Sequence, residues 1–164
     1  HVEFESHMGR GTVFHVWLPA HEGPVELTRE SVHPAPAPGH ETVLLAEDEP
    51  QVRHLIRTVL EQAGYVVLVA EDGERALRLA RRAKQIDLLI SDVRMPQLGG
   101  VQLARELRRT WPEAKVLLMS GCPDIDTVSA CEDDGVEALL AKPFGTNDLL
   151  ARVRRTLDRP DDEN

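Results

Sequence analysis

Short runs of aliphatic residues recur along the second part of the chain and alternate with longer amphipathic segments. Five such runs occupy residues 43–46, 66–69, 88–91, 116–119 and 138–141. Runs that are apolar at nearly every position are typical of strands that are buried on both faces of a parallel sheet. The pattern therefore predicts repeated βαβ units.

The segments that follow the runs predict five helices. The first begins at Pro50, a residue type that is favoured in a first helical turn, and ends at Gly64. Its predicted inward face consists of Val52, Leu55, Ile56, Val59 and Leu60. The others are expected after Gly73 and near residues 101–109, 125–133 and 146–157. With right-handed crossovers, this order gives an α/β fold: a flavodoxin-like, doubly wound sheet of five parallel strands in the order 2-1-3-4-5, with helices on both faces.

A proline-rich stretch divides the chain. Residues 22–40 contain four prolines and few aliphatic residues, so they are expected to form a semi-rigid extended linker. Before the linker, residues 12–18 alternate like a half-buried strand that ends at Pro19. We therefore expect a strand segment at 1–21, the linker at 22–40, one domain at 41–159 and a tail at 160–164, with no output domain after the last helix.

Composition narrows the range of functions. Hydrophobic residues make up 41% of the 164 positions and aromatic residues 4%, which predicts one ordinary domain with an aliphatic core. The formal net charge of -9 argues against a nucleic-acid surface. Cys122 and Cys131 have neither metal-ligand spacing nor the pattern of a disulfide framework. The chain shows neither a bilayer-spanning apolar stretch nor a signal segment, so we expect a cytoplasmic location without direct membrane contact.

Polar groups follow four of the five runs. Glu47-Asp48 comes after the first run, Asp92 after the third, Ser120 after the fourth and Lys142-Pro143 after the fifth. The carboxyl ends of parallel strands meet at one edge of an open sheet, where such folds place their chemistry. Three acids, a hydroxyl and an amine are therefore expected to converge there.

Together with Met95-Pro96 and Gly99-Gly100 behind Asp92, and with Phe144 after Pro143, this set resembles the receiver domain of two-component response regulators. That module also occurs at the C-terminus of hybrid histidine kinases. The resemblance implies a signalling module, not an enzyme, in which Asp92 accepts a phosphoryl group from a phosphohistidine. The donor would be a histidine kinase core or a histidine phosphotransfer domain. This donor is expected to dock on the receiver at the start of the first helix, on Gln51, Val52, His54 and Leu55.

Three neighbouring carboxylates would repel a phosphoryl donor unless a divalent cation lay among them, and Mg²⁺ prefers such oxygen ligands. We assign Asp48 and Asp92 as direct ligands of Mg²⁺, the one cofactor expected. The resemblance adds the backbone carbonyl of Arg94 and a contact of Glu47 through a bound water. Lys142 would supply a second cation against the phosphoryl oxygens.

Ser120 is the expected switch hydroxyl, because a nearby hydroxyl can donate to a newly added phosphoryl group. In the receiver family, an aromatic residue three positions before the conserved lysine follows this movement. Leu139 occupies that position here, which puts the aromatic part of the switch in doubt and leaves phosphorylation untouched. Family members also hold a cis peptide bond after the lysine, which implies a cis bond between Lys142 and Pro143.

Residues 6–19 resemble the last strand of a histidine-kinase ATP-binding domain, in which a glycine pair and a Gly-Thr-x-Phe segment border the nucleotide. A generic strand with turn glycines is the alternative. The resemblance implies that the parent chain is a hybrid sensor histidine kinase. Separated from its sheet, the strand at 13–18 is expected to pair with a neighbouring chain or to pack on the receiver, giving a weak homodimer.

Two other functional classes are weighed against the receiver. An aspartyl phosphohydrolase would carry a second aspartate two residues after its nucleophile, where this chain has Arg94. A flavin or nucleotide module would need a phosphate-binding loop after the first strand, where Glu47-Asp48-Glu49 would repel a phosphate. Both classes are therefore disfavoured.

Overall fold

The computed structural model describes residues 1–19, 39–121 and 138–160. The chain divides into two compact units, residues 1–32 and residues 33–164. The two units are described separately below.

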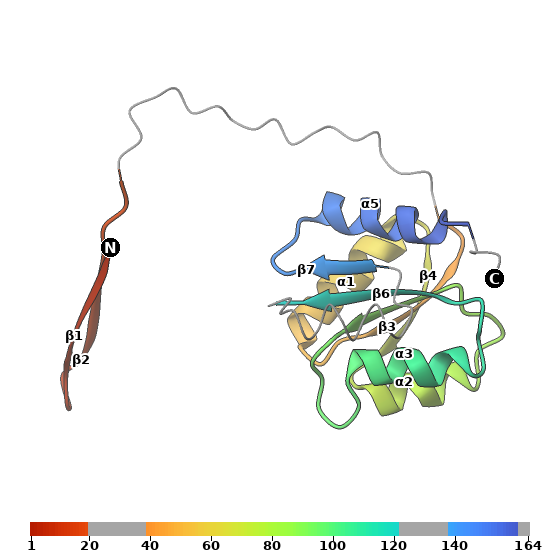
Figure 1. Ribbon diagram of the computed structural model, residues 1–164, viewed down its shortest axis with the longest axis horizontal. Coiled ribbons are helices and arrows are strands. Elements are labelled where there is room, and N and C mark those ends of the chain that lie inside the picture. The colour runs from red at the N-terminus through yellow and green to blue at the C-terminus, as the bar shows by residue number, and fades with distance from the viewer. Residues whose placement is uncertain (20–38, 122–137, 161–164) are drawn as a thin grey trace. The chain divides into compact units, whose positions relative to one another are not determined.

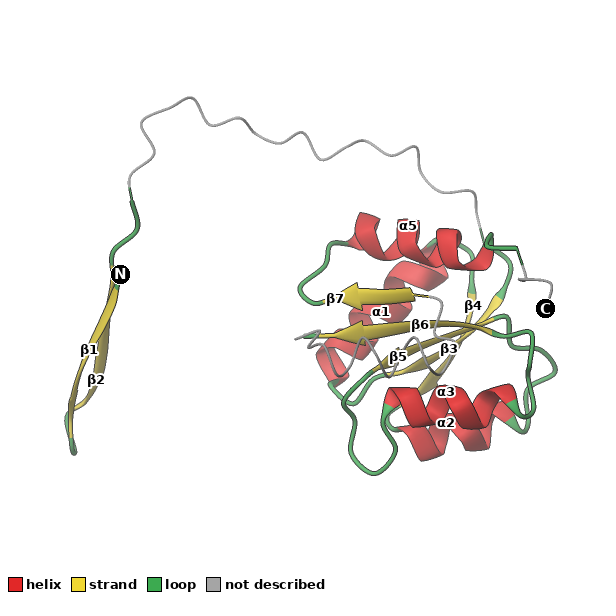
Figure 2. Cartoon of the chain, viewed as in Figure 1, coloured by secondary structure: helices red, strands yellow, loops and turns green. Residues whose placement is uncertain are grey.

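The larger unit is built on a five-stranded parallel sheet (Figure 2). The strands are β3 (Thr42–Ala46), β4 (Val66–Ala70), β5 (Leu88–Asp92), β6 (Lys115–Ser120) and β7 (Ala138–Ala141). Their order across the sheet is β4-β3-β5-β6-β7, which confirms the predicted order 2-1-3-4-5. Each predicted apolar run forms a strand because both faces of the sheet are covered, so that no polar face is needed.

Helices cover both faces of the sheet (Figure 1). They are α1 (Pro50–Gln62), α2 (Gly73–Ala80), α3 (Gly100–Arg108) and α5 (Thr146–Leu157). The α1 and α5 helices share one layer and α2 and α3 share the other, as expected for a doubly wound fold. The helix predicted near residues 125–133 lies outside the described residues.

The core is aliphatic, as the composition predicts, and it is split by the sheet into two layers. Leu44 and Leu89 pack toward α2 and α3, whereas Leu45 and Ile90 pack toward α1 and α5. On α1, the prediction that Leu55 faces inward is wrong, because its side chain is 56% exposed. Leu55 lies roughly 100° around the helix from the buried Ile56, which places it beyond the packed stripe.

Gly39, the first described residue of this unit, packs against the loop that follows α1. Gly39 is buried, and its N–H donates to the carbonyl of Ala63 at 2.8 Å. A side chain at this position would collide with the ring of Tyr65, so the close approach requires glycine. Two residues later, the Glu41 carboxylate pairs with Arg154 of α5 at 2.7 Å.

The smaller unit contains an antiparallel hairpin of β1 (Val2–His7) and β2 (Gly11–Val16). The strand predicted at 12–18 is therefore present, but it pairs with β1 of its own chain, which the sequence reading missed. One face carries Val2, Phe4, Phe14 and Val16, all more than half exposed. The rings of Phe4 and Phe14 lie across from each other, with centroids 6.0 Å apart.

Among the described residues, every helix is too short or too polar to cross a membrane.

Candidate functional site

The polar groups predicted to converge do end at one edge of the sheet. The parallel register aligns Ala46 with Ser91 and Asp92 with Met119, so the residues that follow β3 and end β5 lie side by side. Ser120 ends β6 beside Ala141, which is followed by Lys142. Because the strands are parallel and in register, their carboxyl ends bring together side chains that are up to 95 residues apart in sequence.

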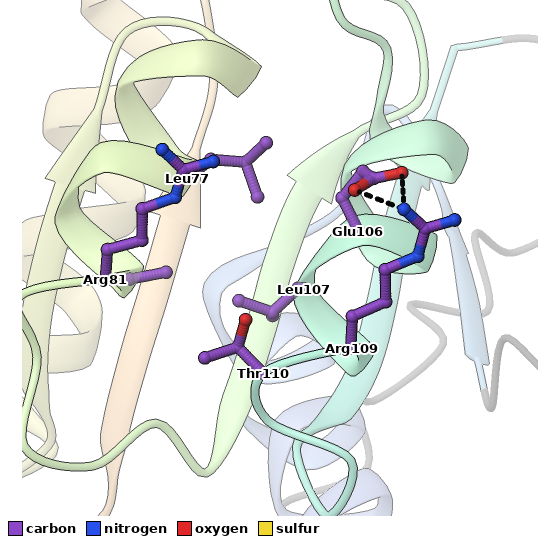
Figure 3. Close-up of a pocket in the computed structure, with 7 residues that line it drawn as sticks. Leu77, Arg81, Glu106, Leu107, Arg109 and Thr110 are labelled. Atoms are coloured by element: carbon purple, nitrogen blue, oxygen red, sulfur yellow. Dashed lines mark hydrogen bonds and ion pairs between the residues drawn. The ribbon is translucent and has the colours of Figure 1, made fainter.

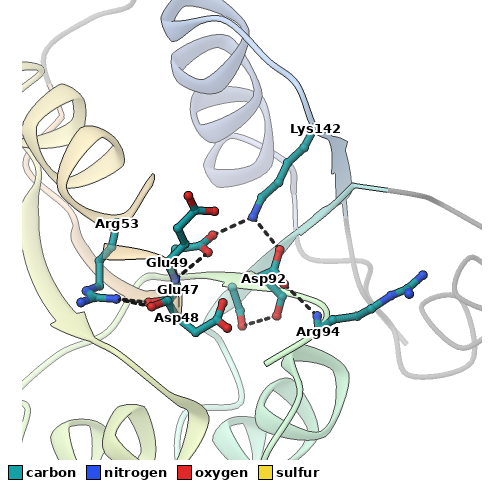
Figure 4. A network of polar contacts seen from close by, with 8 residues as sticks. Glu47, Asp48, Glu49, Arg53, Asp92, Arg94 and Lys142 are labelled. Atoms are coloured by element: carbon teal, nitrogen blue, oxygen red, sulfur yellow. Dashed lines mark hydrogen bonds and ion pairs between the residues drawn. The ribbon is translucent and has the colours of Figure 1, made fainter. Parts of the chain in front are cut away.

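Lys142 lies between two of the three acids (Figure 4). Its ammonium Nζ is 2.8 Å from Glu47 Oε2 and 2.7 Å from Asp92 Oδ1. The peptide bond between Lys142 and Pro143 is cis, as the resemblance implied. Burial raises the pKa of the Glu47 carboxyl, and Lys142 limits that rise. Burial would lower the pKa of Lys142, but hydrogen bonds to Asp92 and Glu47 outweigh it, so this pKa is raised and the amine stays charged.

Asp92 is held from both sides and is 9% exposed. Its second oxygen, Oδ2, accepts a hydrogen bond from the N–H of Arg94 at 2.9 Å. The start of α3 lies against its backbone, because a side chain at Gly100 would collide with the Asp92 carbonyl. The Arg94 side chain points away from Asp92 (Figure 4). The carboxylate is thus fixed by short-range contacts while an opening to solvent remains.

Asp48 lies in the loop between β3 and α1 and is exposed. This loop is held by Arg53, a residue that the sequence reading missed. Arg53 Nη1 donates to the backbone carbonyls of Glu47 at 2.6 Å and Asp48 at 3.0 Å. The signal available in the sequence was an arginine one helical turn after the Glu47-Asp48-Glu49 triplet.

Ser120 is 2% exposed at the end of β6. Its backbone carbonyl accepts a hydrogen bond from the N–H of Lys142 at 2.7 Å, which ties the two strand ends together. Leu139, at the position of the expected aromatic, is half-buried and packs against the layer of α2 and α3. Most of the loop that follows Ser120 falls outside the described residues.

The donor set fits a small divalent cation. Glu47, Asp48 and Asp92 offer oxygen atoms alone, and the Lys142 ammonium pairs with only Glu47 and Asp92, so negative charge remains in excess. Within the described ranges, no three Asp, Glu, His or Cys side chains are grouped closely enough to hold a metal ion. Mg²⁺ needs no such group, because it is commonly held by one or two carboxylates and keeps several waters.

A separate pocket lies between the C-terminal ends of α2 and α3 (Figure 3). Leu77 and Leu107 contribute apolar side chains to it, and Arg81 and Arg109 contribute cations. In a βαβ unit these helix ends lie near the starts of the strands, so the pocket is at the sheet edge opposite the acids. It is not part of the candidate site.

Comparison with known proteins gives a consistent result. The family model described as "Response regulator receiver domain" matches residues 43–154. The sensor kinase CckA of Brucella abortus is 34% identical over 166 residues, which cover 96% of this chain and 18% of that protein. The transcriptional regulatory protein CpxR of Escherichia coli K12 is 37% identical over 117 residues, covering 71% of this chain and 49% of CpxR. The chain thus spans half or less of the length of these curated relatives.

Solved structures show the same similarity. The chemotaxis protein CheY4 of Vibrio cholerae superposes with a TM-score of 0.68 at 28% identity, covering 72% of this chain and 99% of that one. The response regulator TrrA of Thermotoga maritima, solved in complex with Mg(2+)-BeF, gives a TM-score of 0.63 at 28% identity. That match covers 71% of this chain and 98% of TrrA.

Proposed function

The chain belongs to the response regulator receiver family, and on this premise we propose that Asp92 accepts a phosphoryl group from a phosphohistidine in a Mg²⁺-dependent reaction. The observation that carries the proposal is the ammonium of Lys142, which lies within 2.8 Å of both Glu47 and Asp92. A cation held against a strand-end carboxylate is suited to neutralise an incoming phosphoryl group. The module promotes its own phosphorylation and is a signalling component within a phosphorelay, not an enzyme with turnover.

In the transfer step, an Asp92 oxygen would form a bond to phosphorus as the phosphorus–nitrogen bond to the donor histidine breaks. The histidine nitrogen would keep the electron pair of that bond. Both reactants are anionic, so the step depends on positioning and charge neutralisation. Lys142 would contact the phosphoryl oxygens as it now contacts the two carboxylates.

Mg²⁺ would supply further positive charge against the phosphoryl oxygens when bound. Asp48 and Asp92 would hold the ion directly, together with the backbone carbonyl of Arg94. Glu47 would act through a bound water, because its side chain is only 1% exposed.

Ser120 would respond to phosphorylation of Asp92 by a change in its hydrogen bonding. A phosphoryl group adds about -1.5 to -2 charge and three acceptor oxygens. The Ser120 hydroxyl, at the end of the neighbouring strand, would donate to one of these oxygens. Its movement would displace the loop that follows β6.

The phosphohistidine partner, on a kinase core or a phosphotransfer domain, would dock on the start of α1 near the rim of the site. This surface consists of Gln51, Val52, His54 and Leu55. Leu55 is 56% exposed, so its side chain is available for an apolar contact with the partner.

We further propose that residues 1–21 are the end of a histidine-kinase ATP-binding domain, joined by a linker at 22–40 to the receiver at 41–159, which residues 160–164 follow. The match to CckA supports this arrangement because it spans 96% of the chain and therefore reaches N-terminal to the receiver. The apolar face of the hairpin supports it as well, since a two-stranded hairpin is marginal unless it packs on further structure. The parent would be a hybrid kinase with this part in the cytoplasm.

Phosphorylation of the whole chain by a small acyl phosphate and Mg²⁺ tests the central proposal. Intact mass should increase by one phosphoryl group in the wild type and remain unchanged in Asp92→Asn. Asp72→Asn is a matched control, because it removes a carboxylate near the same sheet edge while asparagine still caps α2. Labelling of Asp92→Asn at the wild-type level would place the acceptor elsewhere.

A further inference from the structure

The two carbonyls that Arg53 contacts belong to the peptide groups on either side of the Asp48 α-carbon (Figure 4). Peptide groups are planar and rigid, so fixing both of them fixes φ and ψ of the residue between them. The contacts of Arg53 therefore set the direction in which the Asp48 side chain leaves the backbone.

No direct contact between described residues orients the Asp48 carboxylate. Glu47 and Asp92 are each held through their carboxylates by Lys142. The carboxylate of Asp48, in contrast, makes none of the hydrogen bonds or ion pairs found among the described residues. Its orientation thus depends on its backbone.

Helix stability does not account for Arg53. The side chain folds back over the first turn of α1, where the helix end carries positive partial charge and a cation is unfavourable. The same turn has no acidic residue to compensate and no side-chain cap. The contact with the two carbonyls is what the arginine contributes there.

We propose that Arg53 is a positioning residue that orients the Asp48 carboxylate toward Asp92 and thereby prepares the Mg²⁺ site. The inference rests on the proposed function, because it concerns a ligand of that site. Charge and geometry predict opposite effects of removing Arg53. As a nearby cation it repels Mg²⁺, so charge alone predicts tighter binding after its removal. As a positioning residue, its removal weakens binding.

The test compares Arg53→Met with Arg57→Met in the whole chain, by isothermal titration with Mg²⁺. Arg57 is a matched control, because it lies one turn further along α1 and pairs with the exposed Glu61 at 2.8 Å. Arg53→Met should weaken Mg²⁺ binding about tenfold, the size of effect typical of residues that orient metal ligands. Arg57→Met should leave it unchanged or slightly tighter. Binding by Arg53→Met as tight as in the wild type would overturn the proposal.

Hydrogen exchange in the metal-free protein gives a second readout. The Glu49 N–H donates to Glu47 Oε1 at 3.3 Å, and Arg53→Met should reduce its protection. The Val93 N–H, which donates to the Met119 carbonyl, should keep its protection if the fold is intact. Unchanged protection of Glu49 would also refute the role of Arg53. If Arg53→Met does not fold, Arg53→Gln replaces it. Wild-type chain that bound no Mg²⁺ would refute the proposed function, while Glu49 exchange would still decide on Arg53.

Discussion

Glu41→Gln is expected to destabilise the receiver unit, because Glu41 joins the start of β3 to the far helix α5. Its carboxylate lies 2.7 Å from Arg154 Nη1, and the two side chains are 16% and 23% exposed. Burial alone would raise the pKa of Glu41, but Arg154 and backbone N–H donors outweigh it, so the pKa lies below its ordinary value of 4.5. The pair therefore contributes stability to the folded chain at neutral pH.

The size of the destabilisation in Glu41→Gln follows from the hydrogen bonds that the new side chain can still make. A charge-assisted hydrogen bond contributes about 1.5–3 kcal/mol, and a neutral amide oxygen can still accept from Arg154. Arg154 also keeps its partner Asp158 at 2.8 Å. We therefore expect the free energy of unfolding to fall by about 1–2 kcal/mol at neutral pH. Glu61→Gln, which breaks the exposed pair with Arg57, should cost less than about 0.5 kcal/mol.

The pH dependence gives an independent check. A depressed folded pKa means that the contribution is present above pH 4.5 and is lost as pH falls through the folded pKa. The difference between wild type and Glu41→Gln should therefore shrink in acid. Urea unfolding followed by circular dichroism at about pH 7 and about pH 3.5 measures both effects. A difference that is absent at neutral pH, or that persists unchanged in acid, would refute the reasoning.

Three further predictions concern the site and the hairpin. Asp48→Ala should abolish measurable Mg²⁺ binding, whereas Glu47→Ala should weaken it less, since the contact of Glu47 is proposed to pass through water. Equal affinities of the two variants by titration would contradict this ranking. Phosphorylated chain should lose its label slowly, because Arg94 and Cys122 offer neither an acid nor an amide to orient a water. These residues lie two positions after the proposed acceptor Asp92 and the proposed switch hydroxyl Ser120. Fast loss without a phosphatase, seen by intact mass, would disprove the prediction. The full chain should form a weak dimer through the apolar hairpin face, and a chain that begins at Gly39 should be monomeric. The same association state for both chains in sedimentation at high concentration would rule this out.

The fold was predictable because its strands are apolar at nearly every position. Runs such as 88–91 can be buried only where helices cover both faces, and this condition leaves few topologies. The first strand of the hairpin was missed because β1 alternates but contains only Val2 and Phe4 as large apolar residues. Leu55 was misassigned because a stripe read from spacing alone has no defined width.

The candidate site was predictable for a different reason. Parallel strands bring their carboxyl ends to one edge, so a residue that follows an apolar run can be placed without knowing any contact. Contacts between side chains and backbone carbonyls leave no such pattern, and Arg53 was missed for that reason. The pair of Glu41 and Arg154 was missed as well, because 113 residues separate its members and neither is distinguished from other surface charges in the sequence.

The two carboxylates proposed to bind Mg²⁺ are held by different means, and this difference predicts how substitutions will act. Asp92 ends a buried strand, accepts from a backbone N–H and pairs with Lys142, so changes around it disturb packing as well as charge. Asp48 lies in an exposed loop whose backbone is fixed by Arg53. Substitutions on the loop side should therefore alter metal binding with little loss of stability, whereas those on the strand side should alter both. Unfolding free energies and Mg²⁺ affinities of the same variants would separate the two groups.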